Sequence, residues 1–176
     1  TAETARILKL EYEEAGERND YYLIMDNGMI RVSPVAPPLP FQAYFLSTQG
    51  NVSLTEQAEL YGNLEINIKE DDILGVLKII EPRLTKIRAV GTKLGSTLHG
   101  DIGMGRLVPF PLMGAGIVRL TNIVLHIANA PNGIVLIDEI ENGLHHSVMT
   151  KIWEAVALMA KKTNTQIFAT THSREC

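Results

Sequence analysis

The segment from Gly133 to Ser173 limits the possible folds of this chain more than any other. It holds two short, mainly apolar runs separated by one amphipathic stretch. The runs span Ile134–Asp138 and Gln166–Thr170. Between them, from Ser147 to Lys162, apolar residues recur at the spacing of a helix. A strand, a helix and a strand joined by such short connections predict a βαβ unit, and therefore a parallel sheet with a right-handed crossover.

The N-terminal residues carry a different pattern. From Ala5 to Val35 apolar and polar residues alternate around two turn-forming pairs, Asn19-Asp20 and Asn27-Gly28. This alternation predicts antiparallel strands, with a hairpin at Asp26–Met29. Four prolines within Ser33–Pro40 then predict an extended connector, because proline cannot donate a backbone hydrogen bond.

Two helices are predicted in the middle of the chain. Ser53 is a plausible N-cap for the first helix, and Asp71 or Asp72 for the second. The second helix should stop near Glu81 because Pro82 follows. The same reasoning predicts strands at 43–48 and 86–90, loops and short strands in a glycine-dense tract at 91–116, and a buried helix at 117–130.

Composition restricts the class of protein. The chain has 176 residues, 45% of them hydrophobic, which favours one domain with a core over two. With a formal net charge of -4, the chain lacks the basic character that binding to a nucleic-acid backbone requires. The single cysteine, Cys176, permits no internal disulfide, so we expect a cytoplasmic protein. No apolar run is long enough to cross a membrane, and we expect no membrane partner.

Three acids follow the first aliphatic run: Asp138, Glu139 and Glu141. Ligands of α/β folds bind beyond the carboxyl ends of the parallel strands, so these acids fall at the chemically active edge. Phosphoryl transfer uses one carboxylate to hold Mg²⁺ and a neighbouring one to orient or deprotonate the attacking water. Adjacent strand residues point opposite ways, which lets Asp138 and Glu139 take these separate roles. The alternative interpretation is a strand that merely ends in an acidic turn.

A histidine and two glycines extend this pattern. His172 follows the second run and should emerge at the same sheet edge as Glu139, where an imidazole can donate to a phosphate. Gly114 and Gly116 lead into the predicted buried helix, and the free N–H groups of a helix start can bind a phosphate. Taken singly, the histidine would more often be a satisfied polar residue, and the glycines a plain loop before a core helix.

Taken in order, the stretches MGAG, IVLIDEIENGLH and FATTHS resemble the signature, Walker B, D-loop and switch-histidine elements of ATP-binding-cassette (ABC) type ATPases. The chain is most similar to AAA-type ATP-binding proteins related to the overcoming-lysogenization-defect, Rad-like and structural-maintenance-of-chromosomes ATPases. The resemblance implies that ATP and Mg²⁺ are cofactors. It also implies that Asp138 supports the Mg²⁺, Glu139 is the general base and His172 contacts the γ-phosphate.

The same resemblance implies a head-to-tail homodimer that forms on ATP binding. Gly114 and Gly116 would bind ATP across the dimer interface, with Arg119 one turn into the helix. Asn142 and His145 would belong to the D-loop. Two residues depart from the pattern: Gly114 replaces the signature serine of the transporters, and His145 replaces the acid of many D-loops.

The phosphate-cradling motif G-x-x-x-x-G-K-[ST] occurs nowhere in the sequence. The nearest stretch, GTKLGST at Gly91–Thr97, lacks a lysine after its second glycine and has the wrong spacing. In the family this loop precedes an antiparallel subdomain, so it would lie upstream of Thr1. We therefore expect the C-terminal part of an ATPase domain, inactive by itself.

The expected fold is α/β and P-loop NTPase-like, a partial domain of the ABC ATPase type. It would combine a parallel βαβ core with an antiparallel β subdomain on the N-terminal side. Its expected parts are an antiparallel β region and linker at 1–50, a helical and glycine-rich region at 51–111, and the signature, Walker B, D-loop and switch-histidine core at 112–176. A nucleic-acid or effector partner would bind through regions outside this chain.

Two other functions remain open from the sequence. A metal-dependent hydrolase has six chemically acceptable ligands: Asp138, Glu139, Glu141, His145, His146 and His172. Their spacing is poor, because adjacent histidines point apart and no H-E-x-x-H motif occurs. The second alternative is a non-catalytic module that serves for dimerisation or docking.

Overall fold

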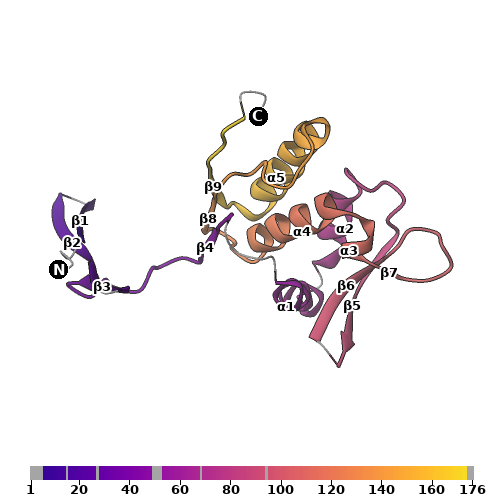
Figure 1. The fold of residues 1–176 in the computed structure, drawn as a ribbon, viewed down its shortest axis with the longest axis horizontal. Coiled ribbons are helices and arrows are strands. Elements are labelled where there is room, and N and C mark those ends of the chain that lie inside the picture. The colour runs from indigo at the N-terminus through magenta and orange to yellow at the C-terminus, as the bar shows by residue number, and fades with distance from the viewer. Residues whose placement is uncertain are drawn as a thin grey trace. The chain divides into compact units, whose positions relative to one another are not determined.

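The structure is a computed structural model that describes residues 6–14, 16–26, 28–48, 53–67, 69–93 and 95–173. The chain forms two compact units, Thr1–Pro40 and Phe41–Cys176 (Figure 1). Within the described ranges, no helix has the length and apolar character needed to cross a membrane.

The first unit is an antiparallel sheet of three strands: β1 (Arg6–Glu14), β2 (Glu17–Asp26) and β3 (Met29–Ser33). The predicted antiparallel strands are confirmed, because β2 pairs with both neighbours. The last pair of β2 and β3 joins Asp26 to Met29, as predicted for the second hairpin. Asn27 of that turn lies outside the described residues.

The predicted turn at Asn19-Asp20 is wrong. Both residues lie inside β2, where they pair with Tyr12 and Glu11 of β1. The chain reverses earlier, at Gly16, whose φ of 84° is a left-handed conformation that glycine adopts without steric cost. Long-range strand pairing therefore overrides the local turn preference of Asn and Asp.

The two faces of this sheet differ in polarity. Strand alternation and register place one group of apolar residues on a common face: Leu8, Leu10, Tyr12, Tyr21, Leu23, Met25, Ile30 and Val32. The opposite face carries ion pairs from Lys9 to Glu11 and Asp20, and from Arg18 to Glu11. This second face also carries Ile7, Tyr22, Ile24 and Met29, so the first face is the more apolar of the two.

The second unit is built around a parallel sheet of β4 (Ala43–Leu46), β8 (Ile134–Ile137) and β9 (Gln166–Ala169), in the order β4-β8-β9. Both pairings are parallel and run through four residues of each strand. Two helices cover one face of this sheet, α4 (Ala115–Ala128) and α5 (Met149–Thr163) (Figure 1). The predicted βαβ unit and α/β fold are confirmed.

The apolar periodicity explains how the sheet binds these helices. Val135 and Ile137 of β8 point toward them and are fully or almost fully buried. On α5, Ile152, Val156 and Met159 recur at helical spacing and are buried as well. Most of α4 is buried, as its nearly continuous apolar sequence predicts.

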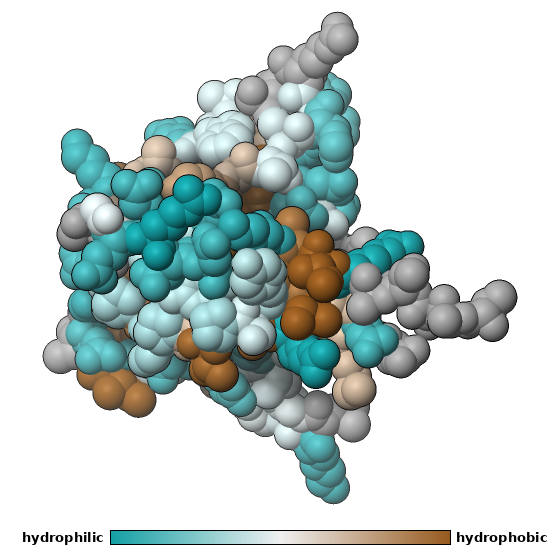
Figure 2. All heavy atoms as spheres, turned by 90° about the vertical axis from the view of Figure 1, so that its left-hand side faces the viewer, coloured by the Kyte–Doolittle hydropathy of each residue, from teal (hydrophilic) through white to brown (hydrophobic). Residues whose placement is uncertain are grey.

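The other face of the parallel sheet is bare among the described residues. Phe45, Leu136 and Phe168 form one row across the three strands, and they are 65%, 41% and 52% exposed. Figure 2 shows one face of the molecule, on which apolar side chains in brown reach the surface beside polar groups in teal. Parallel sheets are normally buried on both faces, so this row is suited to contact with a further element.

A second, antiparallel sheet and four short or medium helices complete the unit. The strands are β5 (Lys86–Thr92), β6 (Gly95–Asp101) and β7 (Val108–Pro109). The helices are α1 (Leu54–Ile66), α2 (Glu70–Leu77), α3 (Phe110–Met113) and the 3₁₀ turn η1 (His146–Val148). The glycine-dense tract thus forms strands and loops as predicted, but it also holds the short helix α3, which the sequence analysis did not predict.

The two predicted N-caps have different outcomes. Ser53 caps α1 by accepting a hydrogen bond from the N–H of Glu56 at 3.2 Å, as predicted. For α2 the N-cap position is Lys69, and the two predicted aspartates lie in the first helical turn. There their charges favour the positive end of the helix, so an acid at the start of the pattern need not be the cap.

The predicted end of α2 near Glu81 is also wrong, since the helix ends at Leu77. Beyond it, the N–H of Ile79 donates to the carbonyl of Val76, and the N–H of Ile80 donates to that of Leu77. The N–H of Glu81 also donates to the Leu77 carbonyl at 3.0 Å, so the segment between the helix and Pro82 forms hydrogen-bonded turns that do not continue α2.

Gly133 sets the spacing between β8 and the start of β4. The N–H of Ile134 donates to the carbonyl of Gln42 at 2.9 Å, and the N–H of Gly133 donates to that of Ala130 at 2.9 Å. A Cβ atom at residue 133 would overlap the Gln42 carbonyl oxygen and lie 3.0 Å from that of Ala130. Both obstacles are backbone atoms, which cannot rotate away.

We therefore expect Gly133→Ala to lower the free energy of unfolding by about 2 to 3 kcal/mol, the usual effect of overpacking. The matched control is Gly62→Ala in α1, where nothing lies within 4 Å of the added Cβ. That variant should raise the free energy of unfolding by about 0.5 to 1 kcal/mol, because alanine is the better helix former. Urea unfolding measures both, and equal effects would contradict the proposed backbone contact.

Candidate functional site

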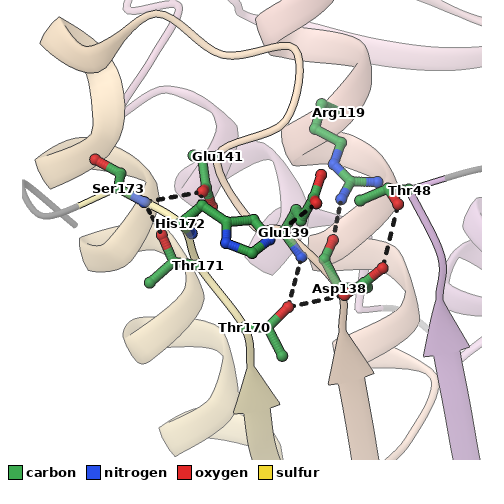
Figure 3. A network of polar contacts seen from close by, with 9 residues as sticks. All are labelled: Thr48, Arg119, Asp138, Glu139, Glu141, Thr170, Thr171, His172 and Ser173. Carbon is green, nitrogen blue, oxygen red and sulfur yellow. Dashed lines mark hydrogen bonds and ion pairs between the residues drawn. The ribbon is translucent and has the colours of Figure 1, made fainter.

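The three parallel strands end at the same edge, and the residues just beyond them form a polar cluster (Figure 3). Backbone pairing continues past the strands, because the N–H of Asp138 donates to the carbonyl of Leu46 and the N–H of Thr170 donates to that of Ile137, both at 2.9 Å. The sheet thereby fixes the backbone from which the polar side chains project.

Both carboxylate oxygens of Asp138 accept hydrogen bonds from hydroxyl groups. Thr170 Oγ1 donates to Oδ1 at 2.8 Å, and Thr48 Oγ1 donates to Oδ2 at 3.1 Å (Figure 3). Since the two threonines follow β9 and β4, the strands on either side of β8 hold this one side chain. Each carboxylate oxygen has about two lone pairs, so acceptor capacity remains for a hydrated cation.

Arg119 reaches the same turn from α4. Its Nη2 donates to the backbone carbonyl of Asp138 at 3.3 Å. Arg119 is only 8% exposed, and this burial lowers the pKa of its guanidinium, while the charge of Asp138 acts in the opposite direction. Its Nε has no hydrogen-bond partner among the described residues. The arginine thus places a buried positive charge beneath the acids of its own chain.

Glu139 adopts a left-handed backbone conformation with a φ of 44°. Such a conformation costs energy for a residue with a Cβ atom, and it is concentrated at functional sites. The N–H of Glu139 donates to Thr170 Oγ1 at 2.9 Å, and the N–H of Ile140 donates to the Thr170 carbonyl at 3.1 Å. Thr170 therefore holds the turn that carries Glu139.

His172 lies beside Glu139, as the sequence predicted from the parallel strand ends. Its Nε2 is 3.2 Å from Oε1 of Glu139, an ion pair when the imidazole is protonated. The histidine side chain is 82% exposed and that of Glu139 is 35% exposed. The pair is therefore preorganised and open to a ligand or to water.

Glu141 contacts the same segment from the other side of the turn. Its Oε1 accepts from the backbone N–H of His172 at 2.6 Å and from that of Ser173 at 3.2 Å. Desolvation by itself would raise the pKa of Glu141. Hydrogen bonds from its own N–H, from His172, from the Thr171 hydroxyl and from Ser173 outweigh it and lower the pKa. The carboxylate is therefore ionised at neutral pH.

The two D-loop candidates lie on the turn after β8. The N–H of Asn142 donates to the Glu139 carbonyl at 2.9 Å, so this residue belongs to the backbone of the acidic turn. His145 Nδ1 lies 2.9 Å from the Ser147 hydroxyl, and its ring centroid is 4.1 Å from that of His146. Among the described residues, the side chain of His145 bonds to Ser147, and no hydrogen bond joins it to Asp138, Glu139 or His172.

The two signature candidates lie at the start of α4. Gly114 is the N-cap with a φ of 119°, and no side chain caps the helix. A Cβ atom at Gly116 would lie 3.8 Å from Cδ2 of Leu144, which places this helix start next to the D-loop candidates. The first N–H groups of α4 are free of side-chain caps and suited to an anion.

The described residues contain no group of three or more histidine, cysteine or acidic side chains placed to hold a metal ion by themselves. The metal-dependent hydrolase therefore has no ready ligand cluster in this part of the chain. A Mg²⁺ ion bound through one carboxylate, water and phosphate needs fewer protein ligands, and Asp138 fits that requirement.

The sequence matches, over residues 7–175, the family described as "AAA domain, putative AbiEii toxin, Type IV TA system". The chain belongs to this family. Among solved structures it is similar to the one titled "Crystal structure of the SmcHead bound to the C-winged helix domain of ScpA", at 13% sequence identity and a TM-score of 0.50. The match covers 89% of this chain and 57% of that chain. No curated protein matches the sequence.

These findings confirm the predicted P-loop ATPase-type fold and the AAA-type relationship. The AAA domain is therefore related to P-loop ATPases. It spans little more than half of the SMC head chain that it resembles. The likeness to that head concerns the fold alone, given the low sequence identity.

Sequence reasoning did not identify the residues that hold the site. The hydroxyls of Thr48 and Thr170 contact Asp138 through tertiary structure, and no motif signals them. The sequence analysis named Arg119 only as a residue of the signature helix at a dimer interface, whereas its Nη2 donates to the Asp138 carbonyl of its own chain. Its position as a charged residue within the apolar run IVRLTNIVL was a signal of such a buried contact. A charge inside a buried helix usually has a partner, so it could have been assigned to the acids.

The left-handed backbone conformation of Glu139 can be tested by comparing the unfolding free energies of two variants at this position. Glu139→Gly and Glu139→Ala both remove the carboxylate, but only glycine relieves the left-handed conformation. We expect the glycine variant of the AAA domain to be more stable than the alanine variant by about 1 kcal/mol in urea unfolding. The control pair is Glu154→Gly and Glu154→Ala on the exposed side of α5, where alanine should be the more stable by a similar amount. The same order at both positions would contradict the assigned conformation.

Proposed function

We propose that this AAA domain is the C-terminal part of an ABC-type ATPase that hydrolyses ATP with Mg²⁺ at a head-to-tail dimer interface. Within the wider class, it would be related to the overcoming-lysogenization-defect and Rad-like ATPases. The observation that carries the proposal is the contact between Glu139 and His172 beside Asp138, at the ends of neighbouring parallel strands.

Asp138 would hold Mg²⁺, whose charge would offset that of the phosphates during transfer. Its carboxylate is fixed by the hydroxyls of Thr48 and Thr170, so it needs little reorganisation when the metal binds. Arg119 anchors the backbone of this turn and offsets part of its negative charge.

Glu139 would accept the proton of the attacking water, and His172 would donate a hydrogen bond to the γ-phosphate. The 3.2 Å contact between their side chains supports these roles, because it holds the base and the phosphate contact side by side. A general base must lie within hydrogen-bond reach of the water that it activates, and the partial exposure of Glu139 permits this.

Gly114 and Gly116 would serve the ATP bound by a second copy. The uncapped start of α4 supports this role, because its N–H groups can donate hydrogen bonds to a phosphate from outside the chain. Asn142 and His145 would line the same interface. This arrangement explains why the signature glycines need no contact with the acids of their own chain.

The loop that cradles the β- and γ-phosphates would come from residues outside these 176, upstream of them in the protein. The sequence contains no G-x-x-x-x-G-K-[ST] motif. The bare row of Phe45, Leu136 and Phe168 offers a face against which a further element of the domain could pack. Under this proposal the residues present would hold the metal and the water, and the upstream loop would hold the phosphates.

Titration of labelled ATP and Mg²⁺ tests the divided site. We expect the 176-residue chain to bind ATP weakly and a version extended to include the phosphate-cradling loop to bind it tightly. Tight binding by the short chain would show that it holds a phosphate cradle of another kind. Hydrolysis that needs a metal but no nucleotide would favour the hydrolase instead.

Glu139→Gln in the full-length protein should slow ATP hydrolysis by about 10²- to 10⁴-fold, the usual contribution of a general base. ATP binding should be unchanged, because the amide keeps the size of the side chain. The matched control, Glu154→Gln on the exposed side of α5, should leave turnover unchanged. Steady-state turnover and equilibrium ATP binding give the two readouts. Unchanged turnover of Glu139→Gln would remove Glu139 from its proposed role.

A further inference from the structure

We propose that Glu141 is a positioning residue that fixes the segment Thr171–Ser173, so that the imidazole of His172 meets Glu139. This inference rests on the proposed function and adds a residue to which the motif assigns no role. Glu141 follows β8, whereas the segment follows β9, so a single carboxylate joins the two strand ends that carry the catalytic candidates (Figure 3).

The exposure of His172 shows why its backbone needs an anchor. Its side chain is 82% exposed, so packing contributes little to its position, and the distance to Glu139 depends on where the backbone runs. Regular pairing of this backbone stops after Thr170, whose N–H donates to the Ile137 carbonyl. Beyond that point, the N–H groups of His172 and Ser173 both donate to Glu141 Oε1.

The chemistry of Glu141 suits an anchor. An ionised carboxylate only accepts hydrogen bonds, and bonds from N–H groups to a charged acceptor are stronger than neutral ones. The 2.6 Å distance from the His172 nitrogen is short for such a bond. The lowered pKa of Glu141 agrees with this arrangement, because these donors favour the charged form.

The same geometry separates Glu141 from the roles of base and metal ligand. Its Oε1 already accepts from the N–H groups of His172 and Ser173, and its Oε2 is buried. Neither oxygen is therefore open to an attacking water or to a hydrated ion. Glu141 acts on the reaction through the position of His172.

The test uses the full-length protein with Glu141→Ala, and with Glu141→Gln as the conservative variant. Alanine removes both backbone contacts, and we expect kcat for ATP hydrolysis to fall by about 10- to 100-fold, as for other small misplacements of a catalytic group. The KM for ATP should change by less than about threefold. Glutamine keeps one acceptor oxygen and should restore part of the lost turnover. Glu154→Ala is the control for removal of an exposed carboxylate.

A double variant shows whether Glu141 acts through the histidine. In a His172→Ala background, adding Glu141→Ala should lower kcat by less than about twofold, because the group to be positioned is already absent. A residue that merely supports folding would cause the same loss in both backgrounds. That result, or unchanged turnover of the single variant, would overturn the inference.

Amide hydrogen exchange provides a readout that does not depend on ATP hydrolysis. In Glu141→Ala, the N–H groups of His172 and Ser173 should exchange about 10-fold faster or more, while those of β8 and β9 keep their rates. Unchanged exchange at the two residues would overturn the inference whatever the turnover. If the unaltered protein hydrolyses no ATP, the proposed function fails, and exchange still decides whether Glu141 holds the segment.

Discussion

The parallel pairing of β4, β8 and β9 is the constraint on which the site depends. Parallel strands run in one direction, so their carboxyl ends meet at one edge, and Thr48, Asp138 and Thr170 are brought together there although they are far apart in the sequence. The spacing of Gly133 and the packing of α4 and α5 keep the strands in this register. Strand direction therefore determines which side chains meet at the site, and the chemistry of the site depends on that arrangement.

The bare apolar surfaces have a related physical origin. A short parallel sheet gains stability only if both faces leave water, yet the described residues cover one face of this sheet. The apolar face of the first unit poses the same requirement, because eight apolar side chains share it. Each of these faces is therefore suited to contact with a further apolar surface.

The sequence predicts the parts of this structure that follow from local periodicity. Aliphatic runs and helical spacing identify β8, α5 and β9, and strand direction then places His172 near Glu139. Prediction from the sequence fails where tertiary contacts determine the local structure. Asn19-Asp20 has turn chemistry but lies inside a strand because pairing with β1 is stronger, and no motif reveals that hydroxyls from two other strands hold Asp138.

The remaining geometry of the site depends on the difference between its rigid elements, the sheet and α4, and the more adjustable turns that follow the strands. The sheet and α4 hold the backbone beneath the acids, whereas Glu139 and His172 project from short turns just beyond the strands. Turns can adopt the left-handed conformation of Glu139, which a regular strand cannot. They are also more mobile than strands, so side-chain anchors such as Thr170 and Glu141 must restore the precision that the sheet no longer supplies. The polar residues around the acids are best understood as this second layer of support.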